Sequence, residues 1–191
     1  MTVRILAISG SARRDSLNRK LLRVAATGAA EAGADVTFAR LTDFNLPLYD
    51  GDLEAERGIP ESVRSLQKLV ASHQALLIAS PEHNGGYTAL LKNAIDWISR
   101  PSEDGKTGVA LFAGKAAALI SASPGPLGGI RSQTDMRAVL DKLGMIVVPQ
   151  SFALGSAHDA FDADGQLLNK NVAQLVADVG AALYRVSSRL S

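Results

Sequence analysis

The stretch VRILAISGSARRDSLN, residues 3–18, decides the fold that this sequence predicts. Val3 to Ile8 is an apolar run that is typical of a buried strand. A loop rich in serine and arginine follows, and a helical pattern begins at Leu17. The loop lacks both the Gly-x-Gly-x-x-Gly turn of dinucleotide-binding folds and the Gly-Lys-Ser/Thr of a Walker loop. The stretch therefore predicts a strand, a polar loop of another kind and a helix.

The same alternation of strand and helix recurs along the rest of the chain. Further strands are expected over Asp35–Leu41, Gln74–Ser80, Ala116–Ala122 and Met145–Val148, and helices over Leu17 to about Ala32, from Pro60 onward, Thr88–Ser99, Ile130–Leu143 and Asn171–Leu190. Three stretches are expected to be irregular: Phe44–Pro60, Arg100–Gly114 and Ser151–Gln166. Apolar strands that alternate with amphipathic helices indicate an α/β fold with a parallel sheet covered on both faces. Without the Gly-x-Gly-x-x-Gly turn after the first strand, the five-stranded order 2-1-3-4-5 is favoured over 3-2-1-4-5.

The composition bounds the function. A length of 191 residues predicts a single domain over residues 1–191. The chain has no cysteine, which excludes disulfides, iron–sulfur clusters and thiol nucleophiles, so any redox chemistry has to come from a bound cofactor. The formal net charge of +1 argues against a broad nucleic-acid surface. His73 and His158 are isolated, so no metal site is expected.

No apolar run approaches the roughly 18–20 residues that a membrane span needs. The apolar run near the N-terminus is too short for the core of a signal peptide. We therefore expect a cytoplasmic protein that does not bind membranes.

Three loops are expected to meet at the carboxyl edge of the sheet, where folds of this order bind ligands. They follow the first, third and fourth strands, and their sequences are SGSARRDSLN, SPEHNGGY and SASPGPLGG. The first loop lies at a helix start, where backbone N–H groups are free, and it offers five candidate anion ligands: Ser9, Ser11, Arg13, Ser16 and Asn18. This combination favours a phosphate. The alternative is that Ser16 merely caps the helix.

The second loop suits a flat heteroaromatic ring. Gly85 and Gly86 allow the backbone to approach closely and to direct N–H groups at ring carbonyls and nitrogens. The alternative is an ordinary turn that needs glycine for its geometry. The third loop could close over the same ring or could be a plain turn.

Two motifs resemble those of the NADPH-dependent FMN reductase family. Gly10-Ser-Ala-Arg-Arg-Asp-Ser-Leu-Asn18 is similar to the family's Gly-Ser-x-Arg-x-x-Ser-x-Asn phosphate loop. Pro81-Glu-His-Asn-Gly-Gly-Tyr87, followed by Leu91-Lys-Asn-Ala-Ile-Asp-Trp97, resembles its second signature, Pro-Glu-Tyr-Asn-x-x and then Leu-Lys-Asn-Ala-Ile-Asp-Trp. The similarity also includes Pro47–Asp50 and Gly128–Arg131, and it runs from residue 3 to about residue 150. Position 83 departs from the family, which often has Tyr there, and His83 could stack less well on a flavin or place charge beside it.

The resemblance implies a flavodoxin-like three-layer sandwich, bound FMN, and two-electron ping-pong reduction of flavin, quinone, azo or chromate acceptors by NADH or NADPH. By motif position, the FMN phosphate would be held by Ser11, Arg13, Ser16, Leu17 and Asn18. The isoalloxazine would be lined by Pro81, Glu82, His83, Asn84 and Gly85, with Ser121 and Ser123 flanking it from the third loop. No catalytic side chain is implied, because the flavin carries the chemistry.

The resemblance further implies a homodimer or homotetramer. The expected helix over Thr88–Ser99 has a broad apolar face made of Leu90, Leu91, Ala94, Ile95, Trp97 and Ile98. That face either packs on a partner chain as well as on its own sheet, or is buried on its own sheet alone.

Two other functions stay open at this point. A flavodoxin-like electron carrier would bind FMN without nicotinamide-dependent turnover, although such carriers tend to be strongly acidic. A module that uses the first loop for another nucleotide would stay colourless when flavin is offered. The choice between NADH and NADPH is open too; Arg13, Arg14 and Arg131 are candidates for a 2′-phosphate site, with Arg13 assigned to FMN.

Overall fold

The computed structural model describes residues 2–103 and 105–190, and a five-stranded sheet with only parallel neighbours lies at its centre. The strands are β1 Arg4–Ser9, β2 Asp35–Arg40, β3 Ala75–Ala79, β4 Ala116–Ala122 and β5 Ile146–Leu154. Their order is β2-β1-β3-β4-β5, which confirms the predicted α/β fold and its 2-1-3-4-5 topology. β1 and β3 are the central neighbours whose connections leave in opposite directions, which places a crevice at their carboxyl ends.

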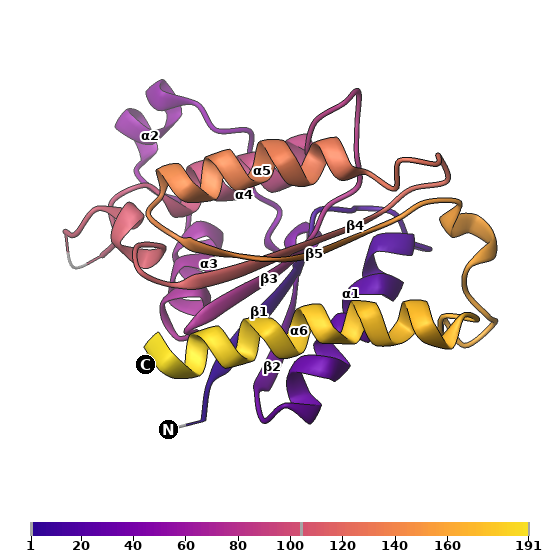
Figure 1. Cartoon of the computed structure of the whole chain (residues 1–191). Helices are drawn as coiled ribbons and strands as arrows, with labels where there is room; N and C mark the ends of the chain where they lie inside the picture. Colours follow the sequence, from indigo (N-terminus) through magenta and orange to yellow (C-terminus); the bar gives the residue numbers. More distant parts are fainter. Residues whose placement is uncertain (1, 104, 191) are drawn as a thin grey trace.

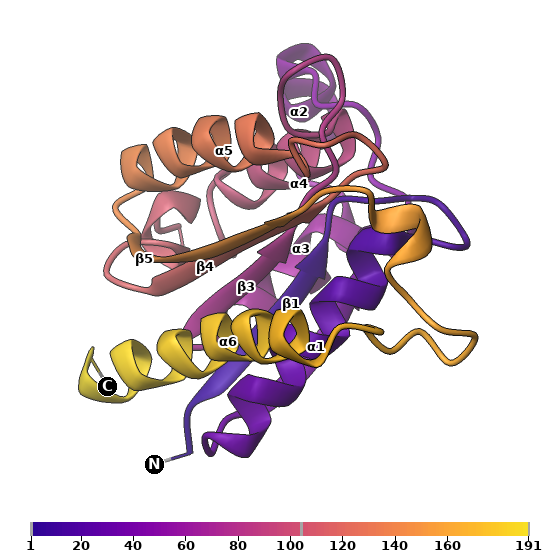
Figure 2. The same cartoon turned by 45° about the vertical axis from the view of Figure 1, so that its right-hand side comes forward.

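Helices cover both faces of this sheet and give three layers (Figures 1 and 2). One face carries α1 Leu17–Glu31 and α6 Lys170–Leu190, and the other carries α3 Glu61–Ala71, α4 Ala89–Ile98 and α5 Ile130–Lys142. A short helix, α2 Gly51–Arg57, and the 3-10 turns η1 Leu41–Phe44, η2 Gly108–Leu111 and η3 Ala157–Asp159 lie between the larger elements. The five long helices begin within about two residues of the predicted starts, and the four whose ends were predicted also end within about two residues of them. Pro60, predicted as the first residue of α3, lies at its N-cap position, and the helix begins at Glu61.

The three central strands are buried on both faces, which is why their sequences are apolar runs. In β1, Ile5 and Ala7 belong to the core beneath α1 and α6. Leu6 and Ile8 belong to the core beneath α3, α4 and α5. Side chains alternate between the two faces of a strand, so one strand serves both cores.

α1 and α6 pack so closely that glycine is required where they cross. A Cβ atom at Gly180 would overlap the carbonyl oxygen of Ala25, and one at Gly28 would overlap the backbone of Ala177. Close backbone approach of this kind is a use of glycine that no larger residue can replace. The crossing holds α1 in place, and with it the first loop at its N-terminus.

Helix α2 corrects the prediction of an irregular segment over Phe44–Pro60. Asp50 caps it by accepting hydrogen bonds at Oδ1 from the N–H groups of Asp52, at 2.8 Å, and Leu53, at 3.3 Å. Gly58 ends it with a φ of +71°. The helix has no buried residue, so its sequence carries no apolar periodicity to reveal it.

Strand β5 corrects a second boundary. The prediction ended it at Val148, whereas the strand runs to Leu154, so Ser151 to Leu154 is not irregular. β5 is an edge strand, and its ladder with β4 has a register shift between Ala117 and Leu119. Pro149 and the polar residues after it are tolerated at such an edge, and they hide the strand from a reading of apolar runs.

The apolar face of α4 packs within its own chain. Five of its six residues are at most 5% exposed: Leu91, Ala94, Ile95, Trp97 and Ile98. The indole N–H of Trp97 donates to the carbonyl of Pro47 at 2.8 Å, and Asn93 donates to the same carbonyl at 2.8 Å. The structure therefore favours burial on the chain's own sheet for this face.

Candidate functional site

A pocket of about 310 Å³ lies where the loops after β1, β3 and β4 meet at the carboxyl edge of the sheet. It is lined by Ser11, Ala12, Arg13, Ser16, Leu17, Asn18, Pro81, Glu82, His83, Ala122, Ser123 and Pro124. The predicted convergence of the three loops is confirmed. Of the predicted site residues, Ser9, Asn84, Gly85 and Ser121 are not part of this lining. The hydroxyl oxygen of Ser9 instead accepts a hydrogen bond from the N–H of Ser11 at 3.3 Å.

The first loop is shaped by its own serines. The Oγ atom of Ser16 accepts a hydrogen bond from the N–H of Arg19 at 3.2 Å, so Ser16 does cap α1. Ser11 Oγ accepts from the N–H of Arg13 at 3.4 Å. The N–H groups of Leu17 and Asn18, in the first helical turn, have no partner within the helix. Capping therefore leaves donors at the helix start that can bind an anion.

Arg13 and Arg19 have different tasks in this loop. Arg19 donates from Nη2 to the carbonyl oxygen of Arg13, at 2.7 Å, and to that of Arg14. These hydrogen bonds attach the backbone of the loop to the first turn of α1. The exposed Arg13 guanidinium forms no hydrogen bond or ion pair with the described residues. Arg13 is thus the cation at the pocket that is available to a ligand. Sequence reasoning missed the task of Arg19, which no motif marks.

Asn18 joins the first loop to the end of β4. Its Nδ2 donates to the carbonyl of Ala122 at 2.8 Å, and its Oδ1 accepts from the N–H of Ala122 at 3.0 Å. The residue is 3% exposed. Its side-chain amide therefore orients the pocket wall, and its backbone N–H is the group that faces the helix start.

The second loop closes in a tight turn. The N–H of His83 donates to the carbonyl of Gly86 at 2.9 Å, and the N–H of Gly86 donates back at 3.1 Å. Asn84 and Gly85, between them, have φ values of +52° and +89°, the signature of a type I′ turn. The N–H of Gly86 is therefore already used, contrary to the expectation that it faces a ring. Pro81, Glu82 and His83 present the pocket side of this loop.

Glu82 ties the second loop to the start of α5. Its Oε1 accepts from Arg131 Nε at 2.7 Å and also from Arg131 Nη2. This hydrogen bonding lowers the pKa of the Glu82 carboxyl below its ordinary value, and partial burial opposes the shift. Among the described residues, Glu82 Oε2 is buried without a hydrogen-bond partner. An unpaired buried oxygen beside a pocket is a group that a ligand N–H or a water would satisfy.

The third loop is held from beneath by Ser121. Its hydroxyl donates to the carbonyl of Gly128 at 2.7 Å and accepts from Gln133 Nε2 at 2.6 Å. Gly128 and Gly129 both have positive φ, at +63° and +89°, and a Cβ at Gly128 would meet the backbone of Ala153. Ser121 is fully buried, so it supports the loop, while Ser123 is the serine that reaches the pocket.

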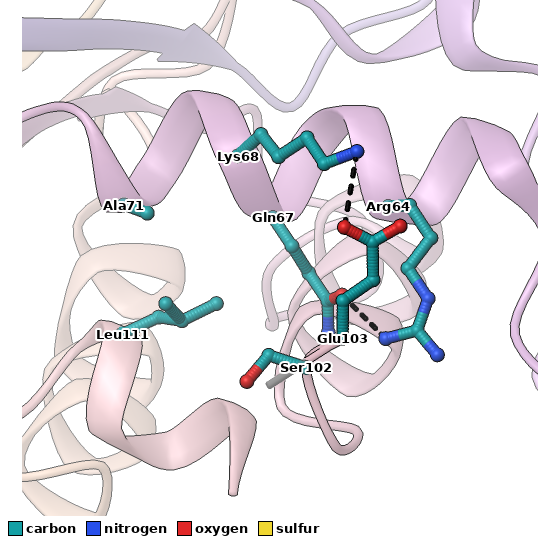
Figure 3. Close-up of a pocket in the computed structure, with 7 residues that line it drawn as sticks. All are labelled: Arg64, Gln67, Lys68, Ala71, Ser102, Glu103 and Leu111. Carbon is teal, nitrogen blue, oxygen red and sulfur yellow. Dashed lines mark hydrogen bonds and ion pairs between the residues drawn. The ribbon is translucent and has the colours of Figure 1, made fainter. Parts of the chain in front are cut away.

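Another hollow, of about 230 Å³, lies between α3 and the segment that follows α4 (Figure 3). Lys68 and Glu103 form an ion pair across it, with Nζ and Oε2 3.1 Å apart. Arg64 Nη1 donates to the carbonyl of Pro101 at 2.7 Å. The charged groups of this hollow thus fasten one segment of the chain to another, and none of the three loops lines it.

Two features are absent from the part of the chain that the structure describes. No group of three or more His, Asp or Glu side chains is placed to hold a metal ion there. Within residues 2–103 and 105–190, no helix combines the length and the apolar character needed to cross a membrane.

Comparison with known proteins gives consistent matches. The family model described as NADPH-dependent FMN reductase matches residues 3–159. An NAD(P)H-dependent FMN reductase of Pseudomonas aeruginosa is 36% identical over 189 residues, which cover 98% of this chain and 97% of that protein. A probable NADPH:quinone oxidoreductase of Oryza sativa is 34% identical, with 98% and 90% covered. Among solved structures, the flavoenzyme NAD(P)H:(acceptor) oxidoreductase FerB of Paracoccus denitrificans superposes with a TM-score of 0.81 at 30% identity, over 98% of both chains.

Proposed function

Because this chain belongs to the NADPH-dependent FMN reductase family and is an NAD(P)H-dependent flavin oxidoreductase, we propose that the pocket at its carboxyl edge holds FMN. The phosphate lies in the first loop and the flat ring lies between the second and third loops. When bound, FMN supplies the redox chemistry, and the protein supplies binding and orientation. The enzyme assignment sets aside the electron carrier and the colourless binding module as readings of this chain.

The donor set of the first loop fits a phosphate monoester, and this observation carries the proposal. Ser11 and Ser16 offer hydroxyls, Arg13 offers an unpaired guanidinium, and Leu17 and Asn18 offer free backbone N–H groups. A dianion gains from such charge-assisted hydrogen bonds and from the positive end of the α1 dipole. The side-chain amide of Asn18 takes no part, since it is bonded to Ala122.

We propose that the second loop contacts one side of the flavin ring and that the third loop contacts the opposite side. One side of the ring site is lined by Pro81, Glu82 and His83, and the chain turns away after them at Asn84–Gly85. Ser123 lies on the opposite side. Ser121 acts as a positioning residue through Gly128. No protein acid or base is required by this arrangement, in which donor and acceptor take turns at the open face.

We propose a quinone or a free flavin as the acceptor, with azo compounds and chromate as further substrates to test. The quinone proposal draws on the relative from Oryza sativa, whose name is NADPH:quinone oxidoreductase. Residence in the cytoplasm and assembly into a homodimer or homotetramer stay predictions. The apolar face of α4 no longer supports assembly, because that face is buried within the chain.

Anaerobic stopped-flow absorbance tests the catalytic part of the proposal. FMN-loaded protein is mixed with NADPH and, separately, with NADH, and the visible flavin band is followed. Loss of the band in one rapid two-electron phase is expected, and the faster donor identifies the preferred nicotinamide. Bound FMN that neither nucleotide bleaches would overturn the proposal.

Fluorescence titration with FMN tests the phosphate site. Arg13→Ala removes the available cation, so the FMN Kd should rise about tenfold or more, the scale of one charged hydrogen bond. Arg185→Ala is the matched control, because Arg185 is exposed on α6 away from the three loops. Equal FMN affinity in the two variants would remove Arg13 from the site.

A further inference from the structure

A second pocket, of about 550 Å³, lies between α1 and the carboxyl end of β2, on the side of the first loop away from β3 and β4. It is lined by Ser9, Arg14, Arg19, Leu22, Arg23, Phe38, Ala39, Arg40 and Asp43, and we call it the arginine groove. It shares no lining residue with the proposed FMN pocket. The two pockets lie on opposite sides of the first loop. Arg13 lines the proposed FMN pocket, and Arg14 lines the arginine groove.

The fold gathers this charge from three separate segments. Arg19 and Arg23 are four residues apart on α1 and so share one helix face. Phe38 and Arg40 are two residues apart on β2 and lie beside Ala7 and Ser9 of β1. Ala7 faces the core under α1, which places Phe38 and Arg40 on the α1 side of the sheet. Arg14 reaches the groove from the first loop.

The groove carries a clear excess of positive charge. Four arginines line it, against one carboxylate, that of Asp43. The Nε of Arg40 lies 3.7 Å from Asp43 Oδ1, and the two side chains are 54% and 66% exposed, so this contact contributes little. Among the described residues, Arg14 and Arg23 have no ion-pair partner. An anion would therefore find unpaired guanidinium donors.

The groove also has an aromatic wall. Phe38 is 54% exposed, although its side chain lies on the face of the sheet that α1 covers. This exposure is possible because β2 is an edge strand. The alternative is that the groove is an ordinary solvent-exposed basic surface. That alternative accounts for the arginines but not for an exposed phenyl ring among them. A flat base stacks on such a ring, and phosphates pair with arginine in bidentate fashion. A phosphorylated nucleotide combines both groups.

We propose that the arginine groove binds the phosphorylated ribose of an adenine nucleotide, with the base against Phe38 and the phosphate on Arg14, Arg23 and Arg40. Two sources have this chemistry: the adenosine end of NADPH and a free adenine nucleotide. The first source rests on the proposed function, and it would make the groove the site that distinguishes NADPH from NADH. Arg14, Arg23 and Arg40 would then bind the 2′-phosphate, whereas Arg131 is hydrogen-bonded to Glu82 and takes no part.

Calorimetric titration of the FMN-loaded enzyme with 2′,5′-ADP tests the groove directly. Binding is expected in the wild type, about tenfold or more weaker after Arg23→Glu or Arg40→Glu, and unchanged after Arg185→Glu. The FMN affinity of each variant, measured alongside, shows that the first loop is intact. No binding of 2′,5′-ADP to the wild type, or equal binding by all variants, would overturn the proposal.

Steady-state kinetics separate the two sources. If the adenosine end of NADPH occupies the groove, Arg23→Glu raises the KM for both nucleotides by different factors. The factor for NADPH should be about ten times the factor for NADH. If a free nucleotide occupies it, the variant loses 2′,5′-ADP binding while both KM values stay at wild-type level. If neither NADPH nor NADH reduces the bound FMN, the proposed function fails, and the titration alone still decides whether the groove binds the nucleotide.

Discussion

The side-chain amide of Asn18 is bonded to the protein, although the residue ends a phosphate-loop motif. Replacing it by alanine would leave the N–H and the carbonyl of Ala122 buried without partners. An unsatisfied buried group costs about 1–3 kcal/mol. We therefore expect Asn18→Ala to lower the free energy of unfolding by an amount in that range, measured by urea denaturation of the FMN-free protein.

Asn171→Ala is the matched control for this change. Asn171 is exposed in the first turn of α6, and its side chain makes no hydrogen bond with the described residues. The control should unfold at the wild-type urea concentration. The tie between α1 and β4 would be unimportant if Asn18→Ala did the same.

The Glu82–Arg131 pair should make stability depend on pH in a defined direction. Hydrogen bonds from Arg131 lower the pKa of Glu82 from its ordinary 4.5. A carboxyl whose pKa is lower in the folded state stabilises the fold fully above its unfolded pKa, and this contribution is lost as the pH falls through the folded pKa. We expect Glu82→Gln to lower the Tm by a constant amount above about pH 5 and by less near pH 3.

Thermal unfolding of wild type and variant between these pH values provides the measurement. Glu56→Gln serves as the control, because Glu56 is exposed on α2 and has no ion-pair partner among the described residues. The Tm difference of the control should not change with pH. A Glu82→Gln difference that grows on acidification would contradict the assigned direction.

Between elements, the crossing of α1 and α6 depends on two glycines. Gly180→Ala would push a methyl group into the carbonyl of Ala25, so the helices would have to separate. Overpacking of this kind costs typically about 1–3 kcal/mol. We expect a loss of at least this size in the free energy of unfolding, and weaker FMN binding as α1 shifts.

Gly51→Ala is the comparison for the crossing. A Cβ there meets nothing nearer than the Tyr49 hydroxyl at 4.0 Å, and Gly51 begins α2. Alanine favours a helix over glycine by up to about 1 kcal/mol, so this variant should be as stable as the wild type or slightly more stable. Equal stability of Gly180→Ala and Gly51→Ala would show that the helices can adjust.

How much the sequence predicts differs between elements. β1, β3 and β4 are buried on both faces, and such strands have apolar runs that can be read directly. α2 has no buried residue, and β5 is interrupted after Val148 by Pro149 and two exposed polar residues, so neither shows a continuous apolar run. α2 is marked in the sequence only by its local cap at Asp50, whereas the second half of β5 depends on pairing with β4, a neighbour in space.

The same division applies to the site. The loops and the cap at Ser16 are local features, so their residues and their meeting point could be predicted. The ties that shape the pocket connect distant positions: Asn18 and Ala122 are 104 residues apart, and Glu82 and Arg131 are 49 apart. The type I′ turn at Asn84–Gly85 was within reach of prediction, because Asn-Gly is the preferred pair for that turn.

For the whole molecule, a ligand that contacts three loops should stabilise the entire fold. A ligand that binds only the folded state adds about 2.7 kcal/mol at a concentration one hundred times its Kd. We expect the Tm of the FMN-free protein to rise steadily with FMN concentration, measured by circular dichroism. The gain should be smaller in Arg13→Ala.

Riboflavin is the matched ligand for this experiment, because it has the ring without the phosphate. At equal concentration it should raise the Tm less than FMN does. Equal shifts with both ligands would mean that the first loop does not bind phosphate. No shift with either ligand would remove FMN from the pocket.

The two hydrogen bonds between Asn18 and Ala122 also bear on how much of its contact energy a bound ligand retains as affinity. The first loop and the end of β4 are joined by the protein itself, so the conformational entropy of ordering them is lost when the chain folds. A receptor that is ordered beforehand gives up less freedom on association, and more of the contact energy remains as affinity. A phosphate that binds in the proposed site would therefore find this wall of the pocket already ordered.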